Sequence, residues 1–366
     1  MAKLVRLPIP SVEIILGSLF AYFGFIGESQ YFDLIAEVGF LYLMFLAGME
    51  VDLKQIANSP RSIIRQSILF LTIMLFFSIG AGLLFGLNRI VLISMPLISI
   101  GLLASLSKTY GKEQHWIKLA FIAGILGEII SIAVLTIFDA ASTTGLNLAL
   151  LEKIGYLTLF LFAVFILYRL LHLLFWWFPE LKKKLVPKFD TSDQDIRLAM
   201  ALFFILIAVM LTLELELALG SFIAGVAISA FFRHEQELEK KMSSLGFGFL
   251  VPLFFIHVGA SFDIRALTVD GVVTGALLIT TLMILSRILA AVALKHIYGS
   301  MEALLAGLSL SMPLTLLVAV ATIGYETKLL DLLSYYQLIL ASIFEILIVM
   351  ATIKILVSKK MEKKEV

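Results

Sequence analysis

The residues best suited to chemistry are two acids that follow the same proline motif inside apolar segments. Ser94-Met95-Pro96-Leu97 recurs 217 positions later as Ser311-Met312-Pro313-Leu314. Each proline is followed after 32 residues by an acid, Glu128 in the first copy and Glu345 in the second. A proline-interrupted helix followed by a helix with a buried carboxylate, present twice, is typical of the central ion sites of secondary transporters.

Glu128 is the main candidate for binding an ion, because the segment from 119 to 131 contains no other charged residue. A carboxyl group buried in an apolar span can hold a proton or bind a hard cation through its oxygens. Ser131 lies one turn further along on the same face. Ser99 and Thr315 offer hydroxyl oxygens close to the two prolines. We predict that Glu128, Ser131, Ser99 and Thr315 bind the proton or a monovalent cation, with Glu128 as the direct ligand.

Arg287 is the basic residue placed deepest in an apolar segment, in the sequence LMILSRILAAVAL. An unpaired buried guanidinium is costly, so we expect it to compensate the charge of a buried carboxylate. The sequence leaves open whether that partner is Glu128 or Glu345. Glu345 is either a second ion site or a structural acid, paired with Arg287 or protonated.

Pro96 and Pro313 each remove a backbone donor in the middle of an apolar segment, and Gly101 adds flexibility after the first of them. We therefore predict two broken helices that cross near the middle of the membrane. The free helix ends would place partial charges there.

The composition indicates a polytopic all-α membrane protein, with 61% hydrophobic residues and a mean hydropathy of +1.04. A transmembrane helix needs about 20 apolar residues, and continuously apolar runs favour helices over a barrel. Twelve segments are predicted to cross the membrane, the eighth being short: 8–26, 32–50, 62–86, 89–107, 115–138, 152–178, 196–214, 217–232, 245–262, 270–294, 300–323 and 330–357.

The motif repeat carries the fourth and fifth segments onto the eleventh and twelfth, a shift of seven. An odd shift inverts the second copy in the membrane, which predicts inverted repeats. We expect a single transporter domain over residues 1–366. It consists of a six-helix half (1–178), a basic linker (179–195) with Lys182-Lys183-Lys184, a second six-helix half (196–357) and a tail (358–366).

The basic residues predict the topology. With the N-terminus placed in the cytoplasm, the cytoplasmic loops and termini hold 22 lysines and arginines, and the opposite side holds 4. This asymmetry predicts that both termini are cytoplasmic. The net charge of +1 argues against a nucleic-acid partner, and the absence of cysteine excludes disulfides and thiol chemistry.

Three stretches resemble motifs of the monovalent cation:proton antiporters, especially the branch with the Kef-type potassium-efflux proteins. The first runs from Ala36 to Asp52 (AEVGFLYLMFLAGMEVD). The second, Leu219 to Gly225 (LGSFIAG), is similar to the family's GAFLAG motif, and the third, Pro252 to Gly259 (PLFFIHVG), to its PLFFVxVG motif. The order and spacing agree from Arg6 to about Val357.

The resemblance implies a homodimer in the inner membrane, in which a core domain moves against a dimerisation domain. The family's acidic pair falls on Gly127-Glu128, and its tenth-helix base falls on Arg287. The chain departs from the family in three places. Glu128 replaces the usual aspartate, Gly127 replaces a polar residue, and Pro313-Leu314-Thr315 replaces an arginine-glycine-glutamate stretch.

We therefore predict a secondary antiporter that exchanges protons for Na⁺ or K⁺ by an elevator-type movement. One acid at the site predicts electroneutral exchange. The alternatives are a cation channel not coupled to protons and a divergent carrier of an organic anion. The absence of a paired catalytic motif argues against an enzyme. No cofactor is expected besides the transported ions, and a separate regulatory subunit is left open.

Overall fold

The computed structural model describes residues 9–27, 29–51, 58–111, 113–144, 148–177, 194–215, 217–231 and 236–365. Within these ranges every regular element is a helix, which confirms the predicted all-α class. Most of the predicted linker, including its three lysines, lies outside the described residues. The predicted tail is not a separate segment up to residue 365, because the last helix continues through it.

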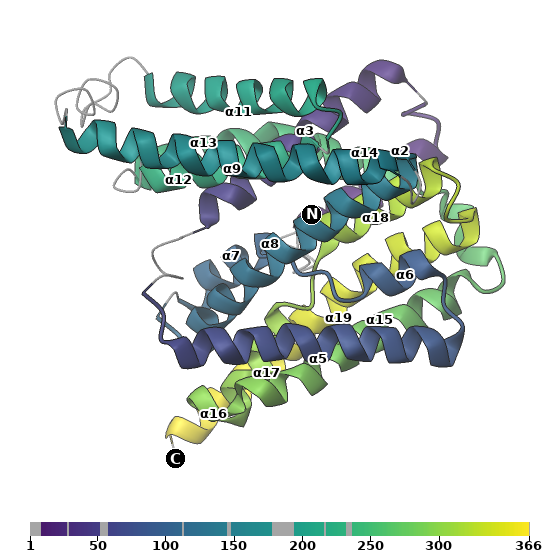
Figure 1. Ribbon diagram of the computed structural model, residues 1–366. Coiled ribbons are helices and arrows are strands. Elements are labelled where there is room, and N and C mark those ends of the chain that lie inside the picture. The colour runs from purple at the N-terminus through teal and green to yellow at the C-terminus, as the bar shows by residue number, and fades with distance from the viewer. Residues whose placement is uncertain are drawn as a thin grey trace. The chain divides into compact units, whose positions relative to one another are not determined.

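The chain divides into two compact units (Figure 1). Unit 1 comprises 1–29, 54–135 and 255–366, and unit 2 comprises 30–53 and 136–254. Two helices contribute to both units: α8 (His115–Thr144) and α14 (Val251–Ala260). Unit 1 further contains α2 (Ile9–Tyr22), α5 (Arg61–Phe85), α6 (Arg89–Ser94), α7 (Gly101–Tyr110), the 3₁₀ helices η2 (Ile264–Thr268) and η3 (Ala291–Leu294), α15 (Val272–Ala290), α16 (Lys295–Tyr298), α17 (Ser300–Ser309), α18 (Leu314–Glu326) and α19 (Leu332–Glu365). Unit 2 further contains α3 (Gln30–Glu50), α9 (Leu148–Trp177), α11 (Gln194–Thr212), α12 (Leu217–Phe231), α13 (Gln236–Leu245) and the π-helix η1 (Gly246–Leu250).

Seven spans among the described residues are long and apolar enough to cross a membrane, and the bent pair α17–α18 makes an eighth. Shorter apolar helices lie in α2, α9 and α12. Each of the twelve predicted segments coincides with one helix or with a consecutive group of helices. The number of membrane crossings nevertheless stays a prediction, because several of these helices are shorter than a full span.

Both predicted broken helices are present. The fourth segment is interrupted between α6 and α7, and the eleventh between α17 and α18, where the direction changes by 42°. Pro96 follows the end of α6, and Pro313 is the N-cap residue of α18. Proline lacks the N–H that a continuous helix needs, so each helix stops there. Figure 1 shows α6 and α7 as two separate short helices.

In unit 2, helices α3 and α12 approach so closely that glycine is required on both. A Cβ on Gly48 would overlap the carbonyl oxygen of Phe222, and a Cβ on Gly225 would overlap that of Phe45. Small residues allow the backbones of helices within a membrane to pack directly against each other. These glycines belong to the first two motif-like stretches, so at these positions the stretches serve helix packing.

Replacing Gly48 by alanine should lower the stability of unit 2 by about 1–3 kcal/mol, because the backbone of α12 must move to admit the methyl group. Gly80→Ala is the matched control. It also lies within a helix, α5, but a Cβ added there would have no neighbouring atom within 4 Å. The readout is the thermal unfolding midpoint in detergent. Equal midpoints for the two variants would contradict the close approach.

Candidate ion site

The candidate site lies in unit 1, where the first broken helix meets α8. Glu128 is fully buried on α8 and its carboxylate accepts two hydrogen bonds from the broken helix. The hydroxyl of Ser99 donates to Oε1 over 3.3 Å, and the backbone N–H of Ile100 donates to Oε2 over 3.4 Å. Ile100 is the N-cap residue of α7, which begins at Gly101. The carboxylate therefore lies at the N-terminus of α7, where the helix dipole favours a negative charge.

Thr315 belongs to the second broken helix and lies next to Ser99. Its hydroxyl oxygen lies 3.5 Å from that of Ser99, and it is in the first turn of α18. Glu128, Ser99 and Thr315 thus form a continuous row of three oxygen-bearing side chains, all buried. Oxygen ligands of this kind suit a hard cation such as Na⁺.

Ser131 lies beside this row but has a different contact. Its hydroxyl oxygen accepts a hydrogen bond from the backbone N–H of Ile98 over 2.9 Å. Ile98 lies in the break between α6 and α7, so this bond satisfies a donor that has no partner within a helix. Ser131 holds the break against α8, one turn from Glu128.

Gly127 explains why no second polar side chain stands beside Glu128. A Cβ at this position would lie 2.6 Å from the Cδ1 atom of Ile98, and 3.1 Å from the Cδ2 atom of Leu71 on α5. The first member of the family's acidic pair would therefore have no room while Ile98 keeps this position. Among the described residues, Glu128 is thus the acid whose carboxylate contacts this break.

Arg287, fully buried on α15, binds the other side of the same break. Its Nη1 donates to the carbonyl oxygen of Met95 over 2.5 Å, and its Nη2 donates to that of Leu97 over 2.7 Å. Further bonds from Nη1 reach its own helix, at Met283 O and Ser286 Oγ. The guanidinium thereby neutralises the negative C-terminal end of α6.

The charge of Arg287 also interacts with Glu345, which is fully buried on α19. The hydroxyl of Ser311, in the second break, donates to Oε1 of Glu345, whereas Oε2 has no partner among the described residues. None of the described residues forms an ion pair with Glu128. Of the two acids that the sequence offered as partners of Arg287, Glu345 is the one with which its charge interacts.

A contact that the sequence did not reveal joins the ends of three helices of unit 1. Glu302, in the first turn of α17, accepts a hydrogen bond from the backbone N–H of Trp116 over 3.1 Å. The same carboxylate forms a salt bridge of 2.5 Å with Lys360 of α19. Since α8 and α19 carry the two buried acids, Glu302 fixes the ends of both helices to the second broken helix. An acid that begins an apolar segment is the signal that could have drawn attention to it.

Arg287→Met should destabilise the protein by about 2–6 kcal/mol, because it leaves two buried carbonyl groups without a donor, at about 1–3 kcal/mol each. Arg287→Lys should recover part of the loss, since a single ammonium donates to fewer groups in this geometry. Arg89→Met, an exposed arginine at the start of α6, is the matched control. Thermal unfolding in detergent measures all three. A midpoint for Arg287→Met equal to that of Arg89→Met would show that the carbonyl bonds contribute nothing.

Comparison with known proteins assigns the chain to a family. The family described as "Sodium/hydrogen exchanger, transmembrane" matches residues 1–359. YjbQ of Bacillus subtilis (strain 168) is 24% identical over 353 residues, which cover 89% of this chain and 55% of YjbQ. The Na(+)/H(+) antiporter of Enterococcus hirae is 24% identical over 361 residues, covering 94% of this chain and 90% of that protein. This chain therefore spans about half the length of one relative and nearly all of the other.

Among solved structures, the sodium proton antiporter MjNhaP1 from Methanocaldococcus jannaschii at pH 8 has a similar fold. The TM-score is 0.65, with 14% sequence identity, and the match covers 96% of this chain and 92% of MjNhaP1. The predicted antiporter-like fold is thereby confirmed. The family match over almost the whole chain and the apolar helices agree that this is a multi-pass membrane protein. The chain belongs to the sodium/hydrogen exchanger family.

Proposed function

We propose that this protein is a secondary antiporter that exchanges protons for Na⁺ or K⁺, with Glu128 as the group that carries either ion. The observation that carries the proposal is the buried carboxylate at the N-terminus of α7, in a row of oxygens with Ser99 and Thr315. The E. hirae relative is named a Na(+)/H(+) antiporter, and its match to this chain supports the same reaction. The proton and the cation would exclude each other, because both need the same carboxylate oxygens.

The mechanism follows from where the charges lie. When Glu128 is ionised, its negative charge is stabilised by the helix N-terminus and by two hydrogen-bond donors, and a cation can join it. When Glu128 is protonated, the site is neutral and the cation leaves. Only these two neutral combinations avoid an uncompensated charge in the apolar interior, so they are the states that move between the two sides. This gives alternating access with one proton exchanged for one cation, and the family resemblance supports an elevator-type movement for it.

The two alternatives fit the site less well. An organic anion would need the N-termini of α7 and α18, but the carboxylate of Glu128 already lies at the N-terminus of α7. A channel would need a continuous path, whereas Glu128, Ser99 and Thr315 are all buried. The arrangement therefore supports ion exchange over both.

The proposal includes the location, the topology and the assembly of the protein. The distribution of basic residues supports an inner-membrane protein with both termini in the cytoplasm. The resemblance to the family supports a homodimer. No cofactor is proposed besides the transported Na⁺ or K⁺ and H⁺, and no catalytic role is assigned to any residue.

Glu128→Gln should abolish proton movement driven by Na⁺ or K⁺, with at least a tenfold loss of rate, because an amide neither releases a proton nor carries charge. Proteoliposomes with a trapped pH dye measure this after addition of Na⁺, K⁺, Li⁺ or choline. Glu345→Gln is the matched control, since it removes the other buried acid at the same distance from its proline. Thermal midpoints check that both variants fold. Exchange that survives Glu128→Gln but not Glu345→Gln would move the site to the second acid.

One carboxylate at the site also predicts that a membrane potential does not drive the exchange. The test uses Na⁺ as the cargo and a potassium diffusion potential set with valinomycin, with the same potassium gradient without valinomycin and without Na⁺ as controls for any exchange of K⁺ itself. The initial rate of proton movement should be the same at 0 and at −100 mV. If one net charge moved per cycle, a potential of 100 mV would change the free energy of the exchange by about 2.3 kcal/mol, and the rate would change measurably. Potential-driven exchange would require a second carboxylate in the cycle.

A further inference from the structure

A groove of about 700 Å³ lies on unit 1 between α5 on one side and η3 and α16 on the other. None of the residues that line it belongs to the ion site, whose side chains are all buried. One end of the groove is polar and contains Arg65, Gln66 and His296. The remainder is lined mostly by apolar side chains: Ile68, Leu69, Ile73, Val292 and Ala293.

The polar end has the groups that an anionic headgroup requires. The side chains of Arg65 and His296 are exposed, and both have N–H groups that can donate hydrogen bonds to a ligand. Arginine presents several donors in a planar fork that fits the oxygens of a phosphate. Gln66 adds an acceptor, because its Oε1 is buried and has no hydrogen-bond partner among the described residues. A buried acceptor without a donor is unfavourable, so a ligand with a hydroxyl group would satisfy it.

The apolar part of the groove faces the surroundings of the protein. Ile68, Leu69 and Val292 are about half exposed, and only 28% of the spanning window of α5 is buried. In a helix that crosses a membrane, such a surface is covered by lipid chains. The groove therefore passes from a polar end with Arg65 and His296 to an apolar wall that suits an acyl chain.

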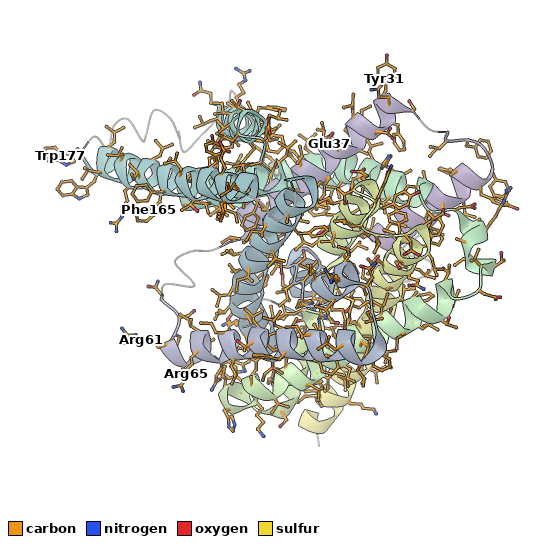
Figure 2. The ribbon with its side chains drawn as sticks, turned by 45° about the vertical axis from the view of Figure 1, so that its right-hand side comes forward. Tyr31, Glu37, Arg61, Arg65, Phe165 and Trp177 are labelled. Carbon is orange, nitrogen blue, oxygen red and sulfur yellow. The ribbon has the colours of Figure 1, made fainter. Side chains whose placement is uncertain are left out.

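The position along α5 agrees with this chemistry. Arg61 and Arg65 lie at the N-terminal end of the helix, as Figure 2 shows. The distribution of basic residues places this end at the cytoplasmic surface of the membrane. Anionic lipids give that surface its negative potential, which attracts arginine and lysine side chains at about 1 kcal/mol each.

We propose that this groove binds one anionic phospholipid with a hydroxylated headgroup, of the phosphatidylglycerol type. Its phosphate contacts Arg65 and His296, a headgroup hydroxyl donates to Gln66, and one acyl chain lies along Ile68 and Val292. The lipid joins α5 to the helical segment that begins with α15, the helix that carries Arg287. The proposal does not depend on the transported ion, so its test measures binding and not exchange.

The experiment measures thermal unfolding of the full chain in dodecylmaltoside while dioleoylphosphatidylglycerol is added. The unfolding midpoint of the wild type should rise with the lipid concentration and reach a plateau. In Arg65→Gln the half-saturating lipid concentration should rise about fivefold, the factor that corresponds to one arginine at a membrane surface. Arg61→Gln is the matched control. It removes a neighbouring basic residue of α5 that does not line the groove, and should bind like the wild type.

Three further arms decide the ligand. Thr72 also lines the groove, beside its apolar part. Thr72→Trp, which fills this part, should weaken binding of the lipid while leaving Arg65 in place. Dioleoylphosphatidylcholine should give little stabilisation, and equal stabilisation by it would overturn the need for an anionic headgroup. Inorganic phosphate or glycerol 3-phosphate should also give little, and an effect as large as that of the lipid would show a site for soluble anions. Equal lipid binding by Arg65→Gln and Arg61→Gln would overturn the proposed location.

Discussion

The structure of the site depends on one constraint, the need to satisfy backbone groups where a helix is broken inside an apolar interior. In a membrane no water is available to bond them, so side chains must do so. Arg287 binds the carbonyl groups of Met95 and Leu97, Ser131 accepts from the N–H of Ile98, and Glu128 accepts from that of Ile100. The residues that could handle ions are thus the same residues that allow the helix to be broken.

This double role also separates the charges. Arg287 lies at the C-terminal end of α6, where the partial charge is negative, and Glu128 lies at the N-terminal end of α7, where it is positive. Each charged group is stabilised by backbone dipoles instead of by the other. A salt bridge between them would have tied up the carboxylate. Because no described residue pairs with Glu128 as an ion, its oxygens remain available to a proton or a cation.

Much of this arrangement could be predicted from the sequence, because it depends on local chemistry. The two prolines predicted both helix breaks. The isolated position of Glu128 in an apolar run predicted that its carboxylate is buried. The sequence could not show where the guanidinium of Arg287 points, since its partners are carbonyl groups about 190 residues away. Nor could it show that Ile98 occupies the space beside Gly127, or that Glu302 holds the ends of α8 and α19. Contacts of this kind are set by the tertiary fold.

The two copies of the motif have diverged in a way that favours one ion site over two. The repeat relates Glu128 to Glu345, but it relates Ser99 to Leu316 and Ser131 to Ile348. The second acid therefore lacks the hydroxyl groups that surround the first, and keeps Ser311 together with the nearby charge of Arg287. A carboxylate held near a permanent positive charge has less need of a cation to balance it. Under the proposed function, the second copy would therefore keep the broken helix and the acid for structure, whereas the first keeps the oxygens that an ion requires.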